Sequence, residues 1–145
     1  MGNILLDTNV VSELMREVPS AEVLAWFAAQ QSASFYVSAI THADILLGIA
    51  MLPVGKRRSQ LARIAEQVLA EDFAGRSWPF DETCAPEYAL LVAAQRSQGR
   101  AISTEDAQIA AIALVRGAPL ATCNVKDFVG ITGLTVVNPW AAANG

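Results

Sequence analysis

The stretch Ile4-Leu-Leu-Asp-Thr-Asn-Val-Val-Ser-Glu13 passes from three apolar residues into polar ones at Asp7. The apolar run 4–6 predicts a short buried strand, and the apolar residues Val10, Val11 and Leu14 suit a short helix directly after it. A strand that ends at an acid and leads at once into a helix is the first unit of the pattern that the rest of the chain repeats.

Strands and helices are expected to alternate along the whole chain. We predict strands at 4–6, 34–40, 78–80, 101–103, 120–123 and 134–137. We predict helices after Asp7, after Pro19-Ser20, and at 42–52, 56–74, 81–98 and 105–116, with one helical turn at 124–128. Thr41 is expected to cap the third of these helices, and Ser103 or Thr104 the last. Such alternation predicts an α/β fold of three layers with a small, mainly parallel central sheet.

Length and composition narrow the class of protein. A chain of 145 residues is the size of one domain, here 1–145, and its 53% hydrophobic content excludes disorder. The net charge of −4 is unlike that of proteins that bind nucleic acid by long-range attraction. Two cysteines make a poor disulfide framework, so we expect a reduced, cytoplasmic location. The longest uncharged stretch, 23–43, is interpreted as a helix, a turn and a strand, and no membrane contact is expected.

Acidic residues follow the predicted strands. Asp7 and Asp127 come after strands, and Asp44 and Asp106 fall in the first turns of helices that follow strands. Ligands of parallel sheets bind outside the carboxyl ends of the strands, so these four carboxylates are expected to converge there. Each acid alone is explained by helix capping and the helix dipole. Four together would repel one another unless a cation joined them.

Helical projection places two of the acids on apolar faces, where we expect them to be buried. Asp44 shares its face with Ile40, Leu47, Gly48 and Met51, and Asp106 shares its face with Ile102, Ile109, Ala110 and Ala113. A site of oxygen ligands without histidine or cysteine favours Mg²⁺ or Mn²⁺. Ions held in this way activate a bound water that can hydrolyse a phosphodiester bond.

Other chemistries have weaker support. The sequence has no glycine-rich nucleotide-binding loop and no GxSxG nucleophile motif. The single histidine, His42, excludes a Cys/His zinc site and is interpreted as a partly exposed surface residue. A dyad of Cys84 or Cys123 with His42 stays a weaker alternative, because lone core cysteines are common.

Four segments together resemble a known family. The opening stretch 4–13, Thr41-His-Ala-Asp-Ile-Leu-Leu-Gly48, Thr104-Glu-Asp-Ala-Gln-Ile-Ala110 and Leu120-Ala-Thr-Cys-Asn-Val-Lys-Asp-Phe128 have the order and spacing of a PIN domain. Over nearly its full length the chain resembles VapC toxins of the FitB-like branch. The resemblance implies an endoribonuclease dependent on Mg²⁺ or Mn²⁺. It also implies a toxin that forms a homodimer, takes RNA as its substrate and is inhibited by a small cognate antitoxin.

The same resemblance assigns roles to residues. It implies that Asp7, Asp106 and Asp127 hold the metal, with Thr8 and Asn124 as supporting polar groups. The fourth family position is usually glutamate, and here it is Asp44, a fourth catalytic candidate. This shortening is the one feature that favours an alternative function, a PIN-like binding protein with little catalysis that acts within an antitoxin complex.

A basic cluster, Lys56-Arg57-Arg58, opens one predicted helix. Cations at the N-terminus of a helix oppose its dipole, so they do not stabilise that helix. Contact with RNA phosphates is therefore a candidate role for the cluster, beside the ordinary role of a solvated face.

Overall fold

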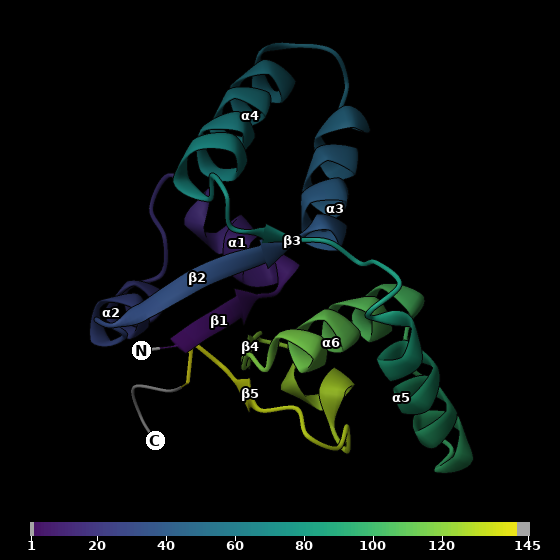
Figure 1. Cartoon of the computed structure of the whole chain (residues 1–145). Helices are drawn as coiled ribbons and strands as arrows, with labels where there is room; N and C mark the ends of the chain where they lie inside the picture. Colours follow the sequence, from purple (N-terminus) through teal and green to yellow (C-terminus); the bar gives the residue numbers. More distant parts are fainter. Residues whose placement is uncertain (1, 142–145) are drawn as a thin grey trace.

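A parallel sheet of five strands forms the centre of the molecule (Figure 1). The computed structural model describes residues 2–141. The strands are β1 (Gly2–Leu6), β2 (Ala33–Ser38), β3 (Ser77–Trp78), β4 (Leu120–Ala121) and β5 (Val136–Val137). Their order across the sheet is β3-β2-β1-β4-β5, and every neighbouring pair is parallel. All carboxyl ends therefore lie at one edge.

Helices fill the connections between the strands. They are α1 (Thr8–Leu14), α2 (Ala21–Ala29), α3 (Ala39–Ala50), α4 (Lys56–Glu66), the π-helix η1 (Gln67–Asp72), α5 (Ala85–Ser97), α6 (Thr104–Arg116) and the 3₁₀-helix η2 (Val125–Phe128). No helix within residues 2–141 is both long enough and apolar enough to span a membrane.

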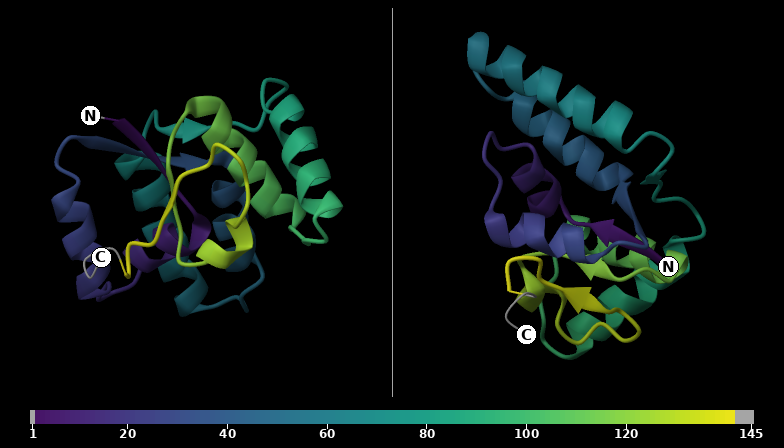
Figure 2. Two further views of the ribbon diagram at one scale, coloured as in Figure 1. Left: turned by 90° about the horizontal axis from the view of Figure 1, so that it is seen from below. Right: turned by 90° about the vertical axis from the view of Figure 1, so that its left-hand side faces the viewer.

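The sheet separates two apolar cores, because successive side chains of a strand point to opposite faces. On β1, Leu5 packs into the core under α5 and α6, whereas Leu6 packs into the core under α1 and α2. On β4, Leu120 and Ala121 divide in the same way. Helices accordingly lie on both sides of the sheet (Figure 2), which confirms the predicted three layers.

The third predicted helix begins earlier than expected. β2 ends at Ser38 and α3 begins at Ala39, so the strand predicted for 34–40 was too long. The cap is Ser38 and not Thr41: the Ser38 hydroxyl accepts a hydrogen bond from the Thr41 amide over 3.0 Å. Thr41 is fully buried in the first turn, where its hydroxyl bonds to another side chain.

The strand predicted at 101–103 is wrong. These residues form no ladder and lead into α6, which Ser103 caps by accepting a hydrogen bond from the Asp106 amide over 3.1 Å. The helix predicted for 56–74 is α4 followed by η1 and ends at Asp72. The helix predicted from 81 begins at Ala85, because the Asp81 carboxylate accepts from the Thr83 amide and holds a turn ahead of it.

Candidate functional site

The carboxyl edge of the sheet carries the four predicted acids. Asp7 follows β1, Asp44 lies on α3, Asp106 lies in the first turn of α6, and Asp127 lies on η2 after β4. Asp106 is close enough to the other three for their charges to raise its pKa. The parallel topology thus brings together four acids that are up to 120 positions apart in the sequence (from Asp7 to Asp127).

Asp7 is the most buried of the four, with 4% of its surface exposed. Its Oδ1 accepts from the Thr8 amide over 2.9 Å, which makes Asp7 the N-cap of α1. Its Oδ2 accepts from the Thr122 hydroxyl over 2.7 Å and from the Asn9 side-chain amide over 3.1 Å. Asp7 therefore has both the structural role expected of a cap and a fixed place in the acidic site.

Asn9 and Thr122 are site residues that sequence reasoning did not identify. The Asn9 carbonyl oxygen accepts from the Cys123 amide over 3.0 Å, and its amide nitrogen approaches the Thr122 hydroxyl at 3.3 Å. Asn9 thereby ties the end of β1 to the turn after β4, which carries Asp127. The signal was present in the quoted motifs, because both residues fall inside them.

Asp44 is half-buried, but the reason predicted for its burial is wrong. Leu47 and Met51 of the expected face are 58% and 76% exposed, and the buried residues of α3 are Thr41 and Ile45. The side chains that approach Asp44 are polar. Its Oδ2 accepts from the Thr8 hydroxyl at 3.5 Å, and the Thr8 hydroxyl also lies 3.0 Å from that of Thr41.

Glu105 is a fifth acid at this edge and was also missed. Its carboxyl group meets that of Asp44, and this contact, with the charge of Asp44, raises the pKa of Glu105. The only signal in the sequence is its place in the first turn of α6, immediately before Asp106. The contact joins α3 and α6 across the site.

Asp106 is half-buried at the start of α6, on the apolar face predicted for it: Ile109, Ala110 and Ala113 are all buried. Burial is the largest cause that raises the pKa of Asp106, followed by the charge of Asp7, with smaller effects from Asp127 and Asp44. The hydrogen bond with Ser103 opposes this shift. The Asp106 carboxylate therefore lies among like charges.

Asp127 and Asn124 are exposed on the turn after β4. Asn124 supports this turn through its backbone, because its amide donates to the Thr122 hydroxyl over 3.0 Å. Its side chain faces the Cys123 thiol at 3.7 Å. Partial burial, together with the charges of Asp7 and Asp127, raises the pKa of the Cys123 thiol.

The donor set of the site is made of hard oxygen atoms, which suits Mg²⁺ or Mn²⁺. Within residues 2–141, none of the four acids forms an ion pair with a lysine or arginine. In the same range, no three Asp, Glu, His or Cys side chains are arranged closely enough to hold a metal ion as they stand. The oxygen donors of these residues suit a hard cation. To bind one, the carboxylate side chains would have to rotate toward one another.

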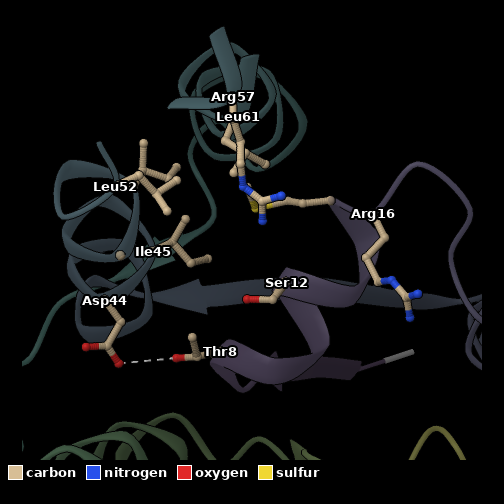
Figure 3. A pocket seen from close by; sticks show the side chains of 11 residues that line it. Thr8, Ser12, Arg16, Asp44, Ile45, Leu52, Arg57 and Leu61 are labelled. Carbon is tan, nitrogen blue, oxygen red and sulfur yellow. Dashed lines mark hydrogen bonds between the residues drawn. The ribbon is translucent and has the colours of Figure 1, made fainter. Parts of the chain in front are cut away.

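A groove opens beside the site between α1, α3 and α4; we call it the α1–α3–α4 groove (Figure 3). Its cavity volume is about 380 Å³. Thr8 and Asp44 form one end, where their hydrogen bond is drawn, and Arg57 enters from α4. Of the predicted basic cluster, Lys56 and Arg58 do not line this groove.

Comparison with known proteins agrees with this architecture. The profile described as "PIN domain" matches residues 4–131. Plasmid stability protein StbB of Pseudomonas syringae pv. tomato is 48% identical over 96% of this chain and 99% of its own length. VapC ribonuclease Y4jK of Sinorhizobium fredii is 41% identical over 97% of this chain and 99% of its own. The solved structure of FitAB bound to the IR36 DNA fragment contains a chain with a TM-score of 0.83 and 39% identity, covering 94% of this chain and 95% of that one.

Proposed function

The chain belongs to the PIN-domain family, within its VapC and FitB group of ribonuclease toxins, and we propose that it cleaves RNA phosphodiester bonds with Mg²⁺ or Mn²⁺. The observation that supports this proposal is the surroundings of Asp106. Burial and the charges of three carboxylates from separate segments raise the pKa of Asp106, and no basic side chain of residues 2–141 pairs with any of the four. A site of this charge needs a cation before it can receive a phosphate.

Each acid has a proposed role. Asp7, Asp106 and Asp127 would hold the cation, and the fixed hydrogen bonds of Asp7 orient one of its oxygens for this. When bound, such a cation lowers the pKa of water and stabilises charge on the leaving oxygen. Asp44 has a shorter side chain than glutamate, and we assign it to orienting the attacking water through a carboxylate oxygen, with Thr8 holding its Oδ2.

The partners follow from the same group of relatives. We propose that a small cognate antitoxin inhibits the protein, that the protein is a homodimer, and that it acts on RNA in the cytoplasm. An exposed apolar stripe on α3 and the turn after it, formed by Leu47, Met51 and Val54, is 58–89% exposed in the single chain. Apolar patches of this kind mark protein interfaces, which supports the homodimer.

Metal removal tests the proposed function. Purified protein should cleave a labelled single-stranded RNA with Mg²⁺ or Mn²⁺, lose cleavage in chelator, and regain it when either ion is restored in excess. Asp106→Asn, purified in parallel, controls for contaminating nucleases and should be inactive throughout. Full activity in chelator excludes the metal mechanism, and no cleavage with any divalent ion would favour the binding-protein alternative.

A further inference from the structure

The α1–α3–α4 groove is continuous with the acidic site. Each of its three helices presents residues spaced by four: Thr8 and Ser12 on α1, Asp44 and Gly48 on α3, and Arg57 and Leu61 on α4. Residues four apart lie on one face of a helix, so three faces meet around one space. Thr8 and Asp44 belong to both the groove and the site.

The groove that leads away from the acids contains an unpaired cationic side chain. Arg57 lines the groove. Within the described residues, Arg57 forms no ion pair, hydrogen bond or ring contact. Some arginines elsewhere are engaged: Arg100 donates to the Val129 carbonyl, and Arg116 lies over the ring of Trp78. Arg58, Arg63 and Arg96 are unpaired within the described residues as Arg57 is, but they do not line the groove. Arg16, at the outer edge of the groove, is ion-paired with Glu13 over 3.3 Å. A phosphate that leaves the acidic site along the groove therefore meets Arg57.

Gly48 of α3 lines the groove. A glycine in the interior of a helix is less stable than alanine by roughly 1 kcal/mol, unless a close contact requires it. No such contact is present, because a Cβ atom added to Gly48 would meet nothing within 4 Å. The space in front of Gly48 belongs to the groove, so a large side chain at this position would fill it.

We propose that the α1–α3–α4 groove binds one nucleotide of the RNA strand, next to the bond that is cleaved. Its phosphate would meet the Arg57 guanidinium, and its base and ribose would lie on the apolar wall formed by Ile45, Leu52 and Leu61. The volume of about 380 Å³ lies at the lower end of the ~300–1,000 Å³ range of small-molecule sites, which fits a single nucleotide. This inference rests on the proposed ribonuclease function and extends it to a substrate subsite.

Charge favours RNA over a protein segment as the occupant. The floor of the groove is apolar and would suit either, but an unpaired arginine beside a cluster of acids suits an anionic group that links the two. A protein segment in the groove is the other outcome that the experiment distinguishes.

The experiment compares four single variants with the parent protein. Gly48→Leu fills the groove, and Ala50→Leu is its matched control, because Ala50 is exposed on the same helix and does not line the groove. Arg57→Ala removes the cation, and Arg63→Ala is its matched control, because Arg63 lies on the same helix but lines a different cavity with Glu17 and Gln60. Cleavage of a short single-stranded RNA gives kcat and KM. Binding is measured at several salt concentrations in an Asp106→Asn background, and melting temperature reports on folding.

We expect Gly48→Leu to lower kcat/KM by at least about tenfold with an unchanged or higher melting temperature. Arg57→Ala should raise KM about tenfold, the equivalent of one charge-assisted hydrogen bond, and lower the log–log salt slope of binding by about 0.7. Arg63→Ala and Ala50→Leu should resemble the parent.

Two results would overturn the inference. If Gly48→Leu and Arg57→Ala cleave and bind RNA like Arg63→Ala, the groove holds no nucleotide, and a protein segment becomes its expected occupant. If the parent protein neither binds nor cleaves RNA with any divalent ion, the proposed function itself fails, and the subsite fails with it.

Discussion

The Thr122 hydroxyl donates a hydrogen bond of 2.7 Å to Asp7 Oδ2, although the two residues are 115 positions apart. Thr122 is fully buried and follows β4, and Asp7 follows the neighbouring strand β1. The bond fixes the direction of the most buried acid of the site. The relationship explains why a threonine, and not an apolar residue, follows this strand inside the core.

We expect Thr122→Val to reduce cleavage and to lower the free energy of unfolding by about 1–3 kcal/mol, because a buried charge-assisted hydrogen bond is lost. Thr122→Ser keeps the hydroxyl and should restore most of both. Denaturant unfolding and cleavage assays on the three proteins measure this. Equal activity in the valine variant would show that the orientation of Asp7 does not matter for catalysis.

Asp106→Asn should abolish cleavage without destabilising the metal-free protein at neutral pH. Burial and the charge of Asp7 raise the pKa of Asp106 above its ordinary 3.8, so the folded state binds the proton more tightly than the unfolded state does. The parent therefore loses stability as pH rises from about 3.8 through the folded pKa, and the loss is complete above it.

The stability difference between Asp106→Asn and the parent should accordingly grow in favour of the variant across this pH window. Melting temperatures in chelator, measured from pH 3.5 to neutral, check the prediction. A variant that melts well below the parent at neutral pH would mean that the Asp106 carboxylate stabilises the fold, as an ordinary first-turn acid does.

We expect Asp44 to be needed for cleavage and Glu105 only to modulate its rate. Asp44→Ala is expected to be close to inactive, because it removes the group assigned to the water. Glu105→Gln removes the like charge beside Asp44 and should leave cleavage within a fewfold of the parent. Rates against Mg²⁺ and Mn²⁺ concentration decide this, and parental activity in Asp44→Ala would leave a site of three carboxylates.

Lengthening Asp44 tests the same site in the other direction. Asp44→Glu extends the carboxylate by about one carbon–carbon bond, ~1.5 Å, and should tighten metal binding or raise the rate. Glu105 is a like charge beside Asp44, so the gain should be larger in Asp44→Glu with Glu105→Gln than in the single variant. Mn²⁺ titration followed by electron paramagnetic resonance reads affinity independently of turnover.

The homodimer should depend on the apolar stripe of α3. Leu47→Glu with Met51→Glu places two charges on residues that are 58% and 76% exposed in the single chain, and should shift a dimeric parent to monomer. Leu90→Glu is the control, since Leu90 is 68% exposed on α5. Light scattering after gel filtration gives the mass; a double variant that stays dimeric would place the interface elsewhere.

Much of the fold could be predicted because strand cores and helix faces are local patterns. The alternation of elements is confirmed. Helix α6 begins one residue before its predicted start and ends at its predicted end, because a serine caps it and Gly117 takes the left-handed conformation at its end. The three residues 101–103 look like a strand by composition, but pairing decides a strand, and no neighbouring strand is available to them.

The site was predictable only in outline. Strand ends located the four acids, whereas contacts between distant segments, such as Asn9 with Cys123 or Glu105 with Asp44, depend on how the connections pack. The prediction for α3 is wrong because Leu47 and Met51, which periodicity places on the core face, are exposed. Helical periodicity identifies an apolar stripe but does not say whether the domain's own core or another protein covers it.

Asp7 is both the N-cap of α1 and a candidate metal ligand, and these two roles affect how genetic screens of this protein should be interpreted. A selection for cells that survive expression of the gene would recover Asp7→Ala for two separate defects, since alanine removes both the cap of α1 and a ligand candidate. Asparagine caps helices as well as aspartate does, so Asp7→Asn separates loss of chemistry from loss of folded protein. Alleles at Asp7 should therefore be scored together with protein abundance before survival is attributed to a disabled site.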